Sequence, residues 1–197
     1  MTKPTLILAS SSRYRRELLD RLGLAYTCVS PDIDESAREG ETALALSVRL
    51  AREKALAVAA QHPGAVVIGS DQVCCLEGRA LGKPGNFEKA CAQLQAMQGR
   101  ELVFHTAVCV LAADGSLQEC VSDTRIRMRP LSDQAIRAYV EREQPYDCAG
   151  SAKIEKLGIA LMQSVQSDDP TSLIGLPLMK VTDMLIAAGL APIEGLV

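Results

Sequence analysis

A turn rich in hydroxyl groups and arginines follows the first apolar run of the sequence. Residues 5–9 are apolar, Ser10 and Ser12 come next, and Arg15 and Arg16 follow closely. If this turn opens a helix, free backbone N–H groups and the helix dipole favour an anion there, and arginines can bridge phosphoryl oxygens. These residues predict a phosphate site, although a serine cap followed by an exposed basic turn would account for them as well.

A lysine stands apart from the other charges of a predicted long helix, residues 41–61. On a helical wheel Lys54 lies in line with Leu50 and Val58, four residues to either side. Its stem therefore runs along an apolar flank that faces the body of the protein. Either the ammonium group reaches past this flank to solvent, or it meets an anionic ligand in a cleft.

An acidic residue comes directly after an apolar run of the kind found in the middle of a sheet. Asp71 follows residues 65–69 and precedes a second apolar run, residues 73–76. A carboxylate at the carboxyl end of a central strand lies where open α/β sheets usually bind ligands, and it could hold a divalent metal or orient a water. A turn aspartate is the alternative, and an isolated Asp is a weak base at neutral pH unless a metal or geometry assists it.

Two further loops add a cation and a carboxylate. Lys83 lies in a rigid Gly-Lys-Pro loop shortly after this acid, and Glu35 lies in an earlier acidic turn. Lysines, paired arginines, serines and separated carboxylates are together what triphosphate chemistry with a hard metal requires. The chain has no P-loop and no dinucleotide-binding glycine pattern, and neither His62 nor His105 stands in a convincing nucleophile context.

Composition restricts the class of protein that these residues serve. The 197 residues are 48% hydrophobic and 23% charged, with a net charge of −3 and a pI near 5.5. A binder of nucleic acid polymers needs a broad basic surface, which this balance lacks. No apolar run is long enough to span a membrane or to act as a signal peptide, so we expect a cytoplasmic protein. The seven cysteines form no CxxC pair and read as small core residues of a reducing compartment.

The elements that must position these residues alternate between strands and helices. This pattern predicts an α/β fold with a mixed sheet in one compact unit, residues 1–197. A glycine turn at residues 113–115 marks a hairpin within it. The expected strands cover residues 5–9, 25–29, 65–69 with 73–76, 102–128 as the hairpin, and 157–165, and the expected helices cover residues 13–22, 41–61, 86–98, 132–143 and 177–188.

Six short blocks, in order along nearly the whole chain, resemble the Maf-like family. The resemblance implies an elongated mixed sheet flanked by helices, with a nucleotide cleft between two lobes, as in the inosine triphosphate pyrophosphatases. It further implies hydrolysis of a nucleoside triphosphate to the monophosphate and pyrophosphate, a divalent cofactor (Mg²⁺ or Mn²⁺) and a possible homodimer. The blocks are Ser10-x-Ser12-x-x-Arg15-Arg16, Arg52-Glu53-Lys54-Ala55, Gly69-Ser70-Asp71-Gln72-Val73, Gly82-Lys83-Pro84, Cys148-Ala149-Gly150-Ser151 and Gly175-Leu176-Pro177-Leu178.

The family's site residues carry over to matching positions. Asp71 matches the proton acceptor, and Glu35 matches an acidic position that would hold the metal together with Asp71. The departure from the family is Arg13, where proline is frequent. The positions that match the phosphate-binding cleft are Ser10, Ser12, Arg15, Arg16, Lys54 and Lys83.

Three positions are similar to the YceF branch of the family, which hydrolyses 7-methyl-GTP. They are Gln72, Glu155 and the aromatic Tyr14. A 7-methylguanine ring is positively charged, so an aromatic face can stack on it and a carboxylate can pair with its edge. A packing tyrosine and a surface glutamate are the alternatives. A dTTP/UTP pyrophosphatase of the same family, or a non-catalytic nucleotide-binding regulator of cell division, would fit the other motifs.

Overall fold

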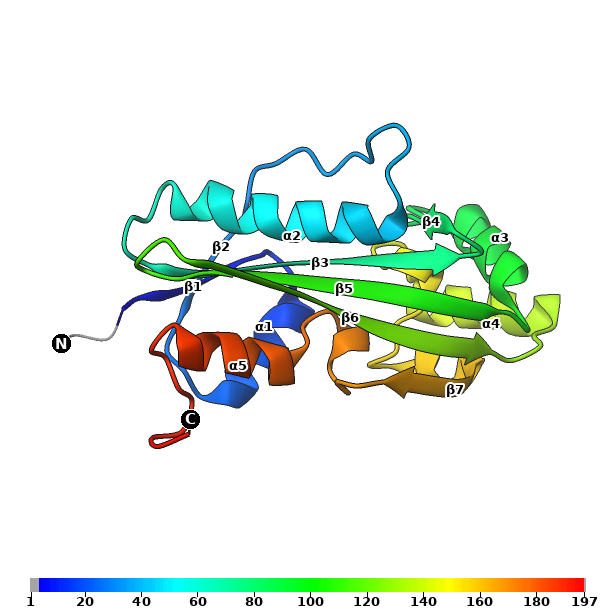
Figure 1. Ribbon diagram of the computed structural model, residues 1–197. Coiled ribbons are helices and arrows are strands. Elements are labelled where there is room, and N and C mark those ends of the chain that lie inside the picture. The colour runs from blue at the N-terminus through cyan, green and yellow to red at the C-terminus, as the bar shows by residue number, and fades with distance from the viewer. Residues whose placement is uncertain (1–3, 197) are drawn as a thin grey trace.

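A mixed sheet runs the length of the molecule (Figure 1). The computed structural model describes residues 4–196. Within this range the sheet has seven strands in the order β2-β1-β3-β5-β6-β7, and β4 pairs with β3 outside that path. The strands are β1 (Leu6–Ala9), β2 (Thr27–Val29), β3 (Val66–Leu76), β4 (Arg79–Leu81), β5 (Glu101–Leu111), β6 (Leu117–Met128) and β7 (Met162–Ser167).

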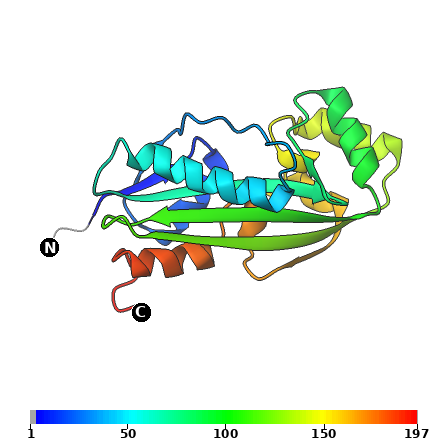
Figure 2. The same ribbon diagram turned by 45° about the horizontal axis from the view of Figure 1, so that its top comes forward.

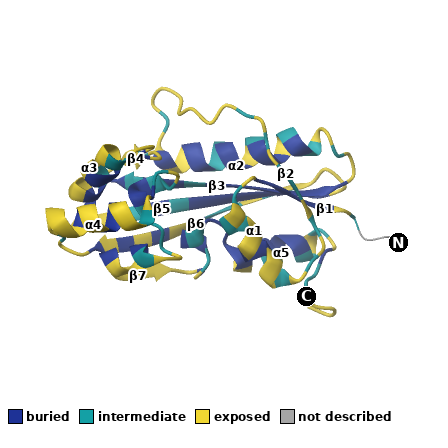
Figure 3. Cartoon of the chain, turned by 180° about the vertical axis from the view of Figure 1, so that it is seen from behind, coloured by how far each residue is buried: buried dark blue, intermediate teal, exposed yellow. Residues whose placement is uncertain are grey.

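Helices cover both faces of this sheet. Helix α2 (Ala43–Ala59) lies along one face, and α1 (Arg13–Leu19) and α5 (Leu178–Ala187) lie on the other, whereas α3 (Phe87–Met97) and α4 (Asp133–Glu143) gather at the far end (Figures 1 and 2). The sides of α2 and α5 that face the strands are buried (Figure 3). Short 3-10 helices connect these elements: η1 (Asp20–Leu22), η2 (Ala149–Ser151), η3 (Leu157–Leu161) and η4 (Ser172–Ile174).

A gap in the sheet creates the cleft. Strand β1 runs parallel to β3 and stops where Ala9 meets Gly69, while β4 begins its pairing at Cys74. Residues 70–73 of β3 therefore have no strand beside them on that side, although β5 pairs with them on the other. The two lobes predicted by the resemblance lie on either side of this gap, and both share β3, β5 and β6.

Close packing of α2 on β3 fixes the spacing at one end of the gap. A Cβ atom on Gly69 would lie 2.2 Å from the carbonyl oxygen of Ala51 and 2.9 Å from the Cβ of Ala55. Only glycine leaves room for a helix backbone at this distance, which is why small residues face each other here. The same contact brings Lys54, which lies between Ala51 and Ala55 on α2, close to β3.

Most predicted elements lie where the sequence places them, with three corrections. Asp71 does not interrupt the strand: β3 is continuous through it, because β5 supplies a partner for each residue. The strand expected at 157–165 begins only at Met162, after η3. Pro177 is the N-cap of α5 and does not lie in its first turn. No helix within residues 4–196 combines the length and apolar character that crossing a membrane requires.

Candidate active site

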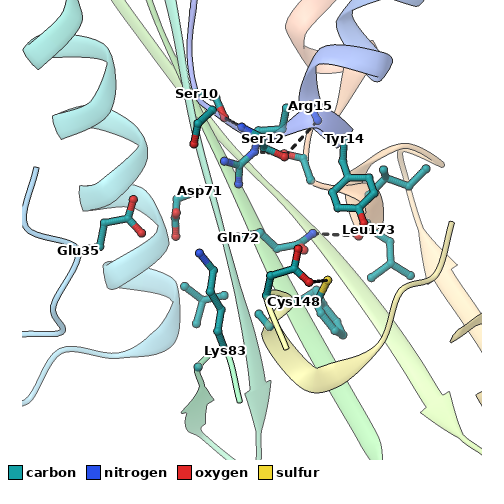
Figure 4. A pocket seen from close by; sticks show the side chains of 18 of the residues that line it. Ser10, Ser12, Tyr14, Arg15, Glu35, Asp71, Gln72, Lys83, Cys148 and Leu173 are labelled. Atoms are coloured by element: carbon teal, nitrogen blue, oxygen red, sulfur yellow. Dashed lines mark hydrogen bonds between the residues drawn. The ribbon is translucent and has the colours of Figure 1, made fainter. Parts of the chain in front are cut away.

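A cavity of about 710 Å³ fills the gap in the sheet, a size within the usual range of small-molecule sites. Its walls come from the turn after β1, the bare edge of β3, the loop after β4 and the turns around η2 and η4. Figure 4 shows Glu35, Asp71 and Lys83 at one side of it and Tyr14, Cys148 and Leu173 at the other. We call these sides the charged end (Arg15, Glu35, Lys54, Asp71, Lys83) and the apolar end (Tyr14, Phe104, Cys148, Glu155, Leu173).

A buried lysine joins two carboxylates at the charged end. The ammonium nitrogen of Lys54 lies 2.7 Å from Oδ1 of Asp71 and 2.8 Å from Oε1 of Glu35. Lys54 is only 4% exposed and Asp71 only 7%, so the stem of Lys54 does not lead to open solvent. The structure therefore contradicts the interpretation that the ammonium group reaches solvent, and it gives Lys54 two protein carboxylates as partners; the anionic ligand stays a prediction.

The surrounding charges favour the ionised form of the Glu35 carboxylate. Partial burial raises the pKa of Glu35, but the hydrogen bond and charge of Lys54, together with Lys83 and Arg15, outweigh burial and leave this pKa below its ordinary value. Within residues 4–196 no hydrogen bond reaches Oδ2 of Asp71. This oxygen is available to a water or a ligand in the cavity.

Arg15 is held in place by a hydrogen bond to the segment at Gly175, which forms another wall of the cleft. Its Nε donates to the carbonyl oxygen of Gly175 at 2.9 Å. Burial lowers the pKa of Arg15, and the charges of Asp71 and Glu35 partly offset this effect. Gly175 has φ 118°, a region that side chains rarely adopt, so the wall takes this course because the residue is glycine. The remaining guanidinium donors can reach an anion in the cavity.

The serine turn contains both residues that were predicted. The hydroxyl of Ser10 accepts the N–H of Ser12, and the hydroxyl of Ser12 caps α1 by accepting the N–H of Arg15. Both serines line the cavity, so their capping role and their place in the site coexist. Arg16, in contrast, does not line the cavity. It is exposed, because its position on α1 directs it outward. The structure therefore does not support Arg16 as a substrate-binding residue.

Tyr14 and Glu155 meet at the apolar end. Burial raises the pKa of Tyr14 to about 12, with the Glu155 carboxylate as the next cause, so the phenol stays protonated at neutral pH. The guanidinium of Arg13 lies 4.8 Å from the centre of the Tyr14 ring and covers it as a cation on an aromatic face. Phe104 and Leu173 provide apolar surface nearby.

Gln72 is bound to the protein through its amide nitrogen. Its Nε2 lies 2.9 Å from the carbonyl oxygen of Ser172, 3.2 Å from that of Leu173 and 3.0 Å from the hydroxyl of Thr106. Successive residues of a strand face opposite ways, so Asp71 meets α2 while Gln72 meets η4. Gln72 lines the cavity, but its donors hold the wall instead of facing a ligand.

Sequence reasoning missed the residues that build this wall. The hydroxyl of Ser70 lies 3.1 Å from the Gly175 carbonyl, and Thr106 donates to the carbonyl of Ser172. The partners are separated by 66 to 105 positions in the chain. The block at residues 175–178 marked the segment, but nothing in one sequence indicates which strand it contacts.

Glu35 and Asp71 could together hold a divalent cation. The Lys54 ammonium takes the place between Oε1 of Glu35 and Oδ1 of Asp71, so a cation would bind the other oxygens of the two carboxylates. Residues 4–196 hold no cluster of three or more His, Cys, Asp or Glu side chains suited to a metal. Mg²⁺ is usually held by one or two carboxylates with substrate phosphates and water, and this pair fits that pattern.

The chain is similar to known proteins over nearly its full length. The family model described as Maf-like protein matches residues 5–188. A protein of Bordetella pertussis named 7-methyl-GTP pyrophosphatase is 56% identical over 98% of this chain and 96% of its own length. A protein of the same name from Thiobacillus denitrificans is 56% identical over 95% of this chain and 94% of its own.

Solved structures align more loosely. A HAM1 protein from Coxiella burnetii is 18% identical, with a TM-score of 0.43 over 64% of this chain and 73% of that chain. A dITP/XTP pyrophosphatase from Mycobacterium abscessus gives 16% identity and a TM-score of 0.41 over 64% and 75%. Alignments this loose carry no weight in assigning a function.

Proposed function

Because this chain belongs to the Maf-like protein family, we propose that it hydrolyses 7-methyl-GTP to 7-methyl-GMP and diphosphate. Relatives above 50% identity that bear the name of this activity support the proposal. The observation that carries it is the Asp71 carboxylate: one oxygen is held by buried Lys54, and the other is open to a cavity of nucleotide size.

The reaction follows from the charged end. A water attacks the α-phosphorus, the bond from that phosphorus to the bridging oxygen breaks, and diphosphate leaves. Oδ2 of Asp71 accepts the proton of the water, while Lys54 orients the carboxylate through Oδ1. Arg15 and Lys83 neutralise the charge that develops on the departing diphosphate.

A divalent cation is part of this proposal. Glu35 would hold it through Oε2, Asp71 would be a further ligand before its Oδ2 accepts the proton, and the substrate phosphates would complete the coordination. When bound, such an ion polarises a phosphoryl oxygen and stabilises negative charge.

The apolar end would select the base. A 7-methylguanine ring is cationic, and Tyr14 offers an aromatic ring while Glu155 offers a negative charge beside it. Gln72 contributes by holding Ser172 and Leu173 in the wall. An uncharged pyrimidine would gain less from the carboxylate because it carries no positive charge, so this arrangement favours the methylated purine.

The test is diphosphate release from 7-methyl-GTP, GTP, dTTP and UTP at equal concentration, with Mg²⁺ and with Mn²⁺. We expect the highest kcat/KM for 7-methyl-GTP. Faster turnover of dTTP or UTP would overturn the substrate, and tight nucleotide binding without turnover in either metal would overturn the activity and indicate a nucleotide sensor.

A further inference from the structure

Glu35 of the charged end lies on a long segment without regular structure. Residues 30–41, which we call the strap, connect β2 to α2 and contain no helix or strand (Figures 1 and 2). The strap brings Glu35 to within 2.8 Å of the Lys54 nitrogen, although the Glu35 side chain is 50% exposed. Holding such a segment in one conformation costs conformational entropy at every residue. The strap must therefore be held in place by contacts with other parts of the protein.

Arg49 of α2 makes those contacts. Its Nε donates to Oε1 of Glu41 at 2.6 Å, and its Nη2 donates to Oε2 of the same carboxylate at 2.8 Å. Nη2 also donates to the carbonyl oxygen of Ser36 at 2.9 Å. Bidentate guanidinium–carboxylate pairs are among the stronger hydrogen-bonded contacts in proteins. The side chains of Arg49 and Glu41 are only 13% and 10% exposed, so water screens this pair weakly.

These contacts hold the strap on both sides of Glu35. Ser36, the next residue, is bound to Arg49 through its carbonyl, and Ile33, two residues earlier, packs against the apolar cluster that includes Leu46 and Leu50 of α2. The same guanidinium also donates to Glu53 at 3.0 Å, which fixes its orientation on the helix. Arg49 thus links the strap to the helix that carries Lys54 at two points, Ser36 and Glu41, and Arg38 of the strap adds a more exposed pair with Glu53 at 3.0 Å.

The pair persists at neutral pH. The hydrogen bonds from Arg49 lower the pKa of Glu41 to about 2, from an ordinary value of 4.5. A carboxylate whose pKa is lowered in the folded protein stabilises it above the ordinary value, and this contribution disappears as the pH falls toward 2. The strap is therefore held throughout the range in which an enzyme of neutral pH works.

We propose that Arg49 is a positioning residue: it holds the strap against α2 so that the Glu35 carboxylate meets Lys54 and Asp71. Arg49 lines no part of the cavity and touches no reacting group. Its effect on hydrolysis rests on the proposed function, whereas its hold on the strap does not.

Hydrogen exchange tests the hold directly. In Arg49→Met we expect amides of residues 34–41 to exchange at least about tenfold faster than in the wild type. Arg52→Met is the matched control, because Arg52 lies on the same helix and pairs with both oxygens of Glu119 on β6, away from the strap. The control should leave the strap unchanged. Equal exchange of the strap in wild type and Arg49→Met would overturn the proposal.

A double-mutant cycle tests the consequence. Displacing a catalytic group by about 1 Å can cost about a hundredfold, so we expect Arg49→Met to lower kcat/KM by about ten- to a hundredfold. In a Glu35→Gln background the same change should cost less than about twofold, because the group that Arg49 positions is already gone. An equal loss in both backgrounds, or a Glu35→Gln variant as active as the wild type, would overturn the proposal.

Glu41→Gln supplies a second variant that leaves α2 intact should Arg49→Met fail to fold. It weakens the pair between Arg49 and Glu41 by changing the strap. We expect it to speed amide exchange of residues 34–41 and to lower kcat/KM, both by less than Arg49→Met does. The two proposals fail differently. If the wild type hydrolyses no nucleotide, the proposed function is wrong, and exchange of residues 34–41 alone then decides whether Arg49 holds the strap.

Discussion

The Lys54–Asp71 pair of the charged end is built by different means from most of the apolar end, although Glu35 and Lys83 lie on loops and Phe104 lies on β5. The charged end draws Lys54 and Asp71 from long regular elements, α2 and β3, whose backbones lie in close contact at Gly69. The apolar end takes Cys148, Glu155 and Leu173 from turns and 3-10 helices. Figure 4 shows Asp71 on one side of Gln72 and Leu173 on the other.

This difference matches what each end must do. A carboxylate that receives a proton needs a fixed position, which packed helices and strands provide. Recognition of a base needs a shape that can be changed without disturbing the chemistry, and short turns provide that. Changes at the charged end should therefore affect turnover of every nucleotide, whereas changes at the apolar end should affect the choice among nucleotides.

The largest effect is expected for Asp71→Asn. The amide keeps the shape of the side chain but accepts no proton, so we expect kcat to fall by about a thousandfold for every substrate. Diphosphate release gives the rate, and nucleotide binding by titration calorimetry should persist. Activity within tenfold of the wild type would show that another group accepts the proton.

Gly69→Ala should disturb the same end from a distance. Its Cβ would lie 2.2 Å from the Ala51 carbonyl, so α2 must move away and separate Lys54 from Asp71. We expect a loss of about 1–3 kcal/mol in the free energy of unfolding and about a hundredfold in kcat/KM. Gly82→Ala, where nothing lies within 4 Å, is the control for stability. Denaturant unfolding and steady-state kinetics measure the two quantities, and a fully active Gly69→Ala would contradict the role of close packing.

Glu155→Gln tests the apolar end. Removing the negative charge should lower the ratio of kcat/KM for 7-methyl-GTP over GTP by about tenfold, or about 1.4 kcal/mol, while GTP turnover changes little. Parallel assays with the two nucleotides decide the matter. If the ratio is unchanged, the carboxylate has no part in base recognition.

Gln72→Met should have a smaller effect. Methionine has a similar length but no donors, so the carbonyls of Ser172 and Leu173 lose their partner. We expect the free energy of unfolding to fall by about 1–2 kcal/mol and substrate preference to shift more than kcat. Thermal or denaturant unfolding, combined with the four-nucleotide assay, gives both. A large fall in kcat with unchanged preference would place Gln72 with the charged end.

The smallest effect concerns the thiol of the apolar end. Burial raises the pKa of Cys148 to about 12, and the Asp147 carboxylate adds to this. Because the thiolate is the reactive form, iodoacetamide should modify Cys148 far more slowly than free cysteine at pH 8, and the rate should rise up to about pH 12. Mass spectrometry of the labelled peptide measures it. Rapid labelling at pH 7 would show that this end is open to water.

The sequence predicts the charged end better than the apolar end, for a physical reason. Helical spacing alone indicates that Lys54 faces inward, and the apolar runs around Asp71 indicate its place on a central strand. These signals are local, because the spacing of apolar residues, which indicates the buried side of a helix or strand, can be seen among neighbouring residues of the sequence. That Gln72 would hold Ser172, a hundred positions away, has no local signal. Arg16 faces outward because of the residue at which the seven-residue helix α1 begins. A sequence does not fix the first residue of so short a helix.

Three long strands run without a break through both lobes. An eleven-residue β3, an eleven-residue β5 and a twelve-residue β6 join one side of the gap to the other. Swinging one lobe toward the other about a hinge would bend every ladder between them and break hydrogen bonds that water does not replace in the core. We therefore expect the cleft to open and close by small movements of peripheral segments around a stiff frame, with little change in the enclosed volume.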